Sequence, residues 1–123
     1  MQAIIDKCVL VVEDEYLIAE EIACNLSRAG ASVLGPCATC TEGLELVADN
    51  LVDAAVLDIS LKNGQSVYPL AEQLMQRGVP FVFCTGYDKE HLRKDFASSP
   101  CLVKPTEGRA LVSAVAQLML DQA

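Results

Sequence analysis

The sequence predicts an α/β fold in which five parallel strands alternate with helices, a (βα)5 arrangement in three layers. The first observation is that its short apolar runs are continuous, as in strands covered on both faces, and do not alternate with polar residues. The second is that longer stretches between these runs carry apolar residues at the helical period. Right-handed crossovers then place helices on both faces of one parallel sheet.

Five runs fit strands. Residues 8–12 and 54–57 are apolar throughout, which predicts central strands, whereas 31–34 contains a serine and suits an edge. The expected strands are residues 8–12, 31–34, 54–57, 80–84 and 101–103.

The first two helices have clear boundary signals. Ile18, Ile22 and Leu26 follow the helical period, and Gly30 stands where a left-handed C-terminal cap belongs. The segment 39–42, Thr-Cys-Thr-Glu, fits a capping box that opens the second helix.

The later helices are less uniform. Ser66 and Thr106 are placed to cap a third and a fifth helix. The third has an apolar stripe that includes Met75 and is expected to face the core. Residues 88–96 are strongly polar, which predicts a short or partly formed fourth helix.

Composition limits the possible functions. A length of 123 residues suits one domain spanning residues 1–123. The net charge of −8 argues against direct binding of nucleic acid or of an anionic membrane. No apolar stretch approaches the roughly 18 residues of a membrane span, so we expect a cytoplasmic chain without membrane insertion. Its six cysteines are then expected to be reduced thiols.

Polar residues follow four of the expected strands. Glu13 and Asp14 follow the first, Asp58 the third, Thr85 the fourth and Lys104 the fifth. Parallel strands bring these positions to one edge of the sheet. Converging carboxylates repel one another unless a cation neutralises them, and oxygen ligands suit Mg²⁺. An aspartate beside Mg²⁺ can accept a phosphoryl group, whose oxygens a lysine and a threonine can hold.

These motifs resemble the receiver domains of two-component response regulators over essentially the whole chain. The matching motifs are Leu-Val-Val-Glu-Asp-Glu at 10–15, Leu-Asp at 57–58, Thr-Gly at 85–86 and Leu-Val-Lys-Pro at 102–105. The resemblance implies a flavodoxin-like sheet with strand order 2-1-3-4-5.

The resemblance also assigns roles to individual residues. It makes Asp58 the phosphoacceptor, and Thr85 and Lys104 the contacts of the phosphoryl group. It implies a cis peptide bond between Lys104 and Pro105. The Mg²⁺ ligands that it implies are Glu13, Asp14, Asp58 and the backbone carbonyl of Ser60.

The run 80–87, Pro-Phe-Val-Phe-Cys-Thr-Gly-Tyr, is similar to the stand-alone "FAT GUY" receivers, named for Phe-Ala-Thr-Gly-Tyr. One departure lies three residues before the lysine, where most receivers carry a switch Tyr or Phe and this chain has Cys101. The usual coupling of Thr85 to that aromatic residue cannot operate unchanged. We hypothesise that Tyr87 takes over part of this switch.

The resemblance implies a single-domain response regulator that is a signalling protein and not an enzyme. Asp58 would accept a phosphoryl group from a histidine kinase or a histidine phosphotransfer protein. The modified state would then bind a downstream protein differently, through the region of the fourth helix, fifth strand and fifth helix.

Three other kinds of protein share parts of this pattern. A pseudo-receiver would bind partners without phosphorylation, and Cys101 keeps this alternative open. An aspartyl-phosphate phosphatase usually needs an acid two residues after its nucleophile, where this chain has Ser60. A flavin-binding electron carrier should have a Ser/Thr-rich loop after the first strand, where this chain has acidic residues.

Overall fold

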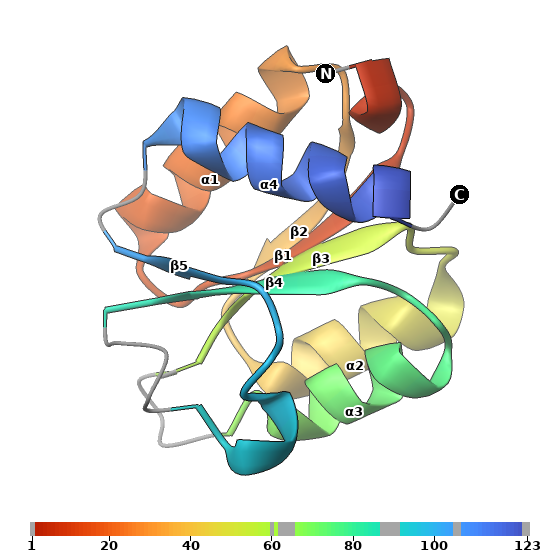
Figure 1. Ribbon diagram of the computed structural model, residues 1–123, viewed down its shortest axis with the longest axis vertical. Coiled ribbons are helices and arrows are strands. Elements are labelled where there is room, and N and C mark those ends of the chain that lie inside the picture. Colours follow the sequence, from red (N-terminus) through yellow and green to blue (C-terminus); the bar gives the residue numbers. More distant parts are fainter. Residues whose placement is uncertain (1, 60, 62–65, 87–91, 105–106, 122–123) are drawn as a thin grey trace.

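A computed structural model describes residues 2–59, 61, 66–86, 92–104 and 107–121. Its centre is one five-stranded sheet in the order β2-β1-β3-β4-β5, with every adjacent pair parallel (Figure 1). This confirms the predicted fold class and the strand order implied by the resemblance. The strands are β1 (Cys8–Val12), β2 (Ser32–Cys37), β3 (Ala54–Asp58), β4 (Phe81–Thr85) and β5 (Cys101–Val103).

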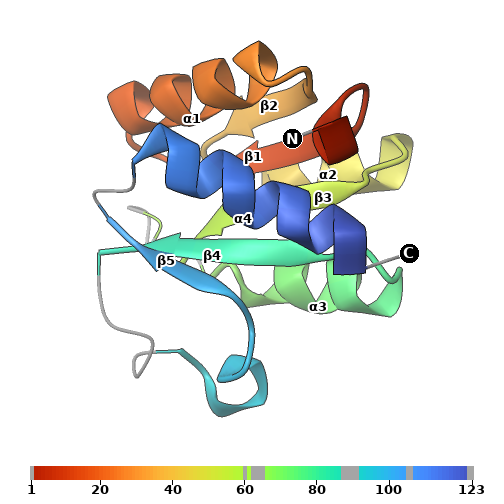
Figure 2. The same ribbon diagram turned by 45° about the horizontal axis from the view of Figure 1, so that its top comes forward.

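Helices cover both faces of the sheet. Figures 1 and 2 show α1 and α4 together on one face and α2 and α3 together on the other. The α-helices are α1 (Tyr16–Arg28), α2 (Cys40–Asp49), α3 (Tyr68–Gln76) and α4 (Gly108–Asp121). Short 3-10 helices lie at η1 (Gln2–Ile4) and η3 (Lys94–Phe96). Among the described residues, none of the helices has the length and apolar character to span a bilayer.

Continuous apolar strands are explained by a core on each side of the sheet. Successive side chains of a strand point to opposite faces. In β1, Leu10 packs with the α2 and α3 layer, whereas Val9 and Val11 pack with the α1 and α4 layer. All five residues of β3 are buried. A polar side chain at these strand positions would therefore enter one core or the other.

The predicted helix boundaries at Thr39 and Gly30 are confirmed, whereas Ser66 is not the capping residue of α3. That position is Val67, and the Ser66 hydroxyl accepts a hydrogen bond from the backbone N–H of Tyr68 at 3.1 Å. The hydroxyl of Thr39 accepts a hydrogen bond from the backbone N–H of Glu42 at 3.1 Å. Gly30 has a φ of 101°, and a Cβ there would lie 2.8 Å from Cγ1 of Ile5. Glycine satisfies both constraints. Thr106 lies outside the described residues.

The described part of the expected fourth helix is not α-helical. Residues 88–91 lie outside the described residues, and within 92–96 the chain forms only the 3-10 helix η3. Arg93, which precedes η3, has a φ of −56° and a ψ of 142°, outside the helical region. The buried side chains of Leu92 and Phe96 anchor this segment to the core instead.

The second strand and Met75 differ from the predictions made for them. The second strand extends to Cys37 through a cis peptide bond between Gly35 and Pro36, beyond the predicted residues 31–34. Met75 is 55% exposed and does not lie in the core, because Leu70, Ala71 and Leu74 already form the buried face of α3.

Candidate functional site

Strand register brings the polar residues of the carboxyl edge together. Val12 of β1 pairs with Leu57 of β3, so Glu13 and Asp58 follow at the same level. Asp58 pairs with Cys84, which precedes Thr85. In turn Thr85 pairs with Val103, and Lys104 follows directly. The sheet itself therefore collects residues that lie up to 91 positions apart, from 13 to 104.

Three carboxylates converge at this edge. One oxygen each from Glu13, Asp14 and Asp58 lies within 4.8 Å of the other two. Glu13 and Asp58 are buried and Asp14 is partly buried. Such a cluster concentrates negative charge where water screens it poorly.

Lys104 provides a cation for this cluster. Its Nζ lies 2.5 Å from Oε1 of Glu13 and 3.2 Å from Oδ2 of Asp58. Its backbone N–H donates to the carbonyl oxygen of Thr85 at 2.6 Å, which fixes the chain next to the buried Thr85 side chain. Burial alone would lower the pKa of Lys104, but the hydrogen bond to Glu13 and the charge of Asp58 raise it.

The lysine only partly offsets the cost of burying the acids. Burial, together with the hydrogen bond and charge of Asp58, raises the pKa of Glu13 to about 7. The hydrogen bonds from Lys104 and from the backbone N–H of Glu15, at 3.1 Å to Oε2, act in the opposite direction. A second cation at this cluster would therefore be stabilised electrostatically.

The donor set fits Mg²⁺. Its three carboxylates are hard oxygen ligands from Glu13, Asp14 and Asp58, and neither His nor Cys belongs to the cluster found among the described residues. The expected fourth contribution, the carbonyl of Ser60, lies outside the described residues.

A cavity adjoins Lys104 between α1 and α4. It has a volume of about 330 Å³ and a mostly apolar lining: Ile18, Glu21, Ile22, Asn25, Cys84, Lys104 and Leu111. The sequence did not predict this cavity, because it arises from the packing of two helices that are distant in the chain. Tyr16 and Leu17 are a second feature that sequence reasoning missed: they are 74% and 80% exposed. The sequence does contain a signal for them, because they are large apolar residues directly after the acidic motif 13–15.

The expected switch residues are only partly described. Cys101 lies on β5, pairs with Phe83 of β4 and packs against the core on the α3 side of the sheet. Tyr87 and the peptide bond between Lys104 and Pro105 lie outside the described residues. The assignments made for them therefore stay predictions.

Several solved structures are similar to this chain in both sequence and fold. The solution structure of SdrG from Sphingomonas melonis Fr1 is 35% identical, covers 97% of this chain and 99% of its own, and has a TM-score of 0.81. The receiver (REC) domain of the Erythrobacter litoralis PhyR response regulator is 27% identical, with coverages of 96% and 93% and a TM-score of 0.83. A solution structure of SdrG in a BeF3-activated conformation is 36% identical, with coverages of 91% and 95% and a TM-score of 0.78.

Curated sequences give the same relationship at lower identity. The phyllosphere-induced regulator PhyR of Methylorubrum extorquens is 29% identical over 109 residues, which are 87% of this chain and 41% of PhyR. The transcriptional regulatory protein PdtaR of Mycobacterium tuberculosis is 26% identical over 116 residues, with coverages of 92% and 57%. The chain thus spans about half the length of these relatives. No protein-family model matches it.

Proposed function

The chain belongs to the receiver domains of two-component response regulators, and from this premise we propose that Asp58 is its phosphoacceptor. The supporting observation is the arrangement around Asp58: the residue is 4% exposed, Nζ of Lys104 lies 3.2 Å from its carboxylate, and Glu13 and Asp14 complete an oxygen cluster. The proposal places residues 1–123 in one receiver domain and the chain in the cytoplasm.

The proposed reaction is phosphoryl transfer from a phosphohistidine. A carboxylate oxygen of Asp58 forms a bond to phosphorus, the N–P bond breaks, and its electron pair returns to the imidazole. Lys104 offsets the negative charge on the acyl phosphate, and the Thr85 hydroxyl donates to a phosphoryl oxygen. Bound Mg²⁺ would neutralise phosphoryl charge, with Glu13, Asp14 and Asp58 holding it.

Donors of this kind are histidine kinases and histidine phosphotransfer proteins. Tyr16 and Leu17 support an approach at the start of α1, because they expose apolar surface immediately after the carboxylates. We also propose that the chain acts on a downstream protein. It would have a stand-alone role without an enzymatic activity of its own.

A pseudo-receiver is the second candidate. The observation that favours it is Cys101, which stands on β5 where most receivers carry the switch aromatic. In that case partner binding would not depend on Asp58.

Intact mass distinguishes the two candidates. The protein is incubated with phosphoramidate and Mg²⁺, alongside Asp58→Asn, a chelator control and the exposed control Asp49→Asn. We expect one phosphoryl adduct in the wild type and in Asp49→Asn, and none in Asp58→Asn or with chelator. A folded wild-type protein without an adduct would support the pseudo-receiver.

A further inference from the structure

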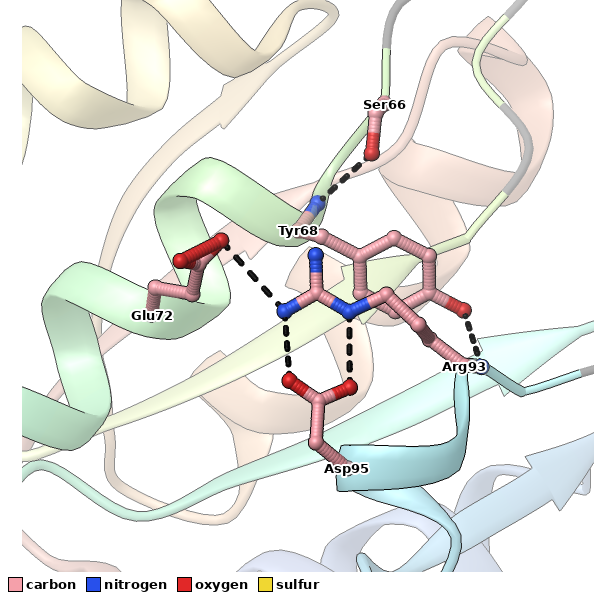
Figure 3. Close-up of polar contacts among 5 residues, drawn as sticks. All are labelled: Ser66, Tyr68, Glu72, Arg93 and Asp95. Carbon is pink, nitrogen blue, oxygen red and sulfur yellow. Dashed lines mark hydrogen bonds and ion pairs between the residues drawn. The ribbon is translucent and has the colours of Figure 1, made fainter.

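Tyr68, the first residue of α3, bonds to a segment 25 residues further along the chain. Its hydroxyl oxygen accepts a hydrogen bond from the backbone N–H of Arg93 at 3.0 Å (Figure 3). Its ring stacks on Phe96, with a centroid distance of 5.4 Å and an interplanar angle of 17°. The same ring meets Phe83 of β4 edge to face at 6.1 Å.

The Arg93 side chain adds further contacts between the same two elements. Figure 3 shows its guanidinium group between the carboxylates of Asp95 and Glu72. Two 2.7 Å hydrogen bonds join it to Asp95, and an ion pair of 3.4 Å joins it to Glu72 on α3. The guanidinium carbon also lies 4.8 Å from the centroid of the Tyr68 ring and 5.0 Å from that of Phe96. We call this group, Tyr68, Glu72, Arg93, Asp95 and Phe96, the Tyr68 clamp.

Stacking and hydrogen bonding together define the clamp. Exposed ion pairs contribute little alone, and the Arg93 and Glu72 side chains are 41% and 49% exposed. A two-pronged guanidinium contact that also stacks on aromatic rings has a more restricted geometry. The hydrogen bond to Tyr68 involves the Arg93 backbone, so the clamp holds the main chain as well as the side chain.

The Tyr68 clamp joins two parts of the chain that each follow a residue of the carboxylate site, Asp58 in one case and Thr85 in the other. After Asp58, the last residue of β3, the chain reaches Tyr68 ten positions later, since 68 − 58 = 10. After Thr85, the last residue of β4, it reaches Arg93 eight positions later, since 93 − 85 = 8. The hydrogen bond between Tyr68 and Arg93 is therefore a direct contact between the chain that follows β3 and the chain that follows β4.

Among the described residues, no α-helix between β4 and β5 packs against α3 in place of the clamp. The described residues between β4 and β5, 86 and 92–100, contain only the 3-10 helix η3. Edge-to-face contacts of Phe96 with Phe81 (6.0 Å) and Phe83 (5.8 Å) seat η3 against β4, and the clamp adds its connection to α3. Cys101, on the neighbouring strand, has no ring with which to share this role.

We propose that Tyr68 is a positioning residue that couples the segment after Thr85 to α3 through Arg93. This inference rests on the proposed function, because the change that it transmits begins when a phosphoryl group occupies Asp58. The change would reach the surface at a shallow pocket of about 320 Å³ lined by Glu72, Met75, Gln76, Asp95 and Phe96. Both sides of the clamp contribute to its walls.

Backbone amide NMR spectra test this coupling. Spectra of the isotope-labelled protein are recorded with and without Mg²⁺ and beryllofluoride, an analogue of the phosphoryl group. The variants are Tyr68→Phe, which removes the hydroxyl and keeps the ring, and Arg93→Ala. Arg109→Ala, at an exposed position on α4, is the matched control. Unchanged signals of α1 in the unliganded variants establish that they fold.

We expect wild type and Arg109→Ala to show shifts at 58 and 85 and also along 70–76 in α3. In Tyr68→Phe and Arg93→Ala the shifts at 58 and 85 remain, whereas those along 70–76 are lost. Wild-type α3 shifts in either clamp variant would overturn the role of the residue changed. Absence of α3 shifts in the wild type would overturn the coupling itself. If no residue responded, including 58 and 85, the proposed function would fail as well.

Discussion

The Nζ atom of Lys104 lies 2.5 Å from Oε1 of Glu13, two residues on opposite sides of β3 in the sheet order. The same ammonium lies 3.2 Å from Asp58. It therefore occupies the charge cluster that we assign to Mg²⁺ and to phosphoryl transfer.

Replacing Glu13 by glutamine should stabilise the metal-free protein at about pH 8. Because its folded-state pKa of about 7 lies above the ordinary 4.5, the folded protein binds the Glu13 proton more tightly than the unfolded chain. The resulting stability is present below pH 4.5 and is lost as pH rises through 7. Glu13→Gln should avoid this loss, a gain of about 1 kcal/mol and a melting temperature higher by several degrees.

Thermal unfolding in a chelator from about pH 5 to pH 8.5 measures this effect. Glu20→Gln, at an exposed position on α1, is the control and should follow the wild type. A lower melting temperature for Glu13→Gln than for wild type at pH 8 would show that the lost contact with Lys104 outweighs the relief of desolvation.

Asp14→Asn should weaken Mg²⁺ binding by at least about tenfold, equivalent to about 1.4 kcal/mol. The reason is the loss of one of three anionic oxygen ligands. Because a ligand of the native state raises the melting temperature by mass action, unfolding at increasing MgCl₂ reports the affinity. Glu15→Gln changes an adjacent acid outside the cluster and should behave as wild type. Equal Mg²⁺ responses in both variants would remove Asp14 from the site.

Lys104→Met should have opposite effects on metal binding and phosphorylation. Removal of the ammonium leaves Glu13 and Asp58 without their close cation, so Mg²⁺ affinity should rise. The rate of phosphorylation by phosphoramidate should fall by about 100-fold or more, because a cation that stabilises the transferring group is gone. Mg²⁺-dependent unfolding and time-resolved intact mass measure the two effects. A phosphorylation rate equal to that of wild type would contradict the role of Lys104.

Leu17→Ser should slow phosphotransfer from a protein donor without changing phosphorylation by phosphoramidate. Leu17 is 80% exposed, follows Asp14 by three residues and is not part of the carboxylate cluster, so only a macromolecular donor should contact it. Leu51→Ser is the matched control, because Leu51 is 94% exposed after the end of α2. The measurement is the initial rate with a phosphorylated histidine phosphotransfer domain. Equal rates for both variants would place the donor contact elsewhere.

The sequence predicted the fold and the edge of the sheet that carries the site. Uninterrupted apolar runs require two covered faces, and polar residues directly after them must emerge at the carboxyl ends of the strands. That local pattern was enough to select Glu13, Asp14, Asp58, Thr85 and Lys104 as the residues that could meet.

Only the tertiary structure decided how these groups share their charges and what lies around them. The position of Lys104 between Glu13 and Asp58 depends on the register of four strands. The Tyr68 clamp depends on α3 and η3 coming together, and η3 is a 3-10 helix in the described part of the segment where a short or partly formed fourth helix was predicted. Periodicity records which face of an element is buried, but contacts between side chains distant in the chain are set by packing, which a local pattern does not contain.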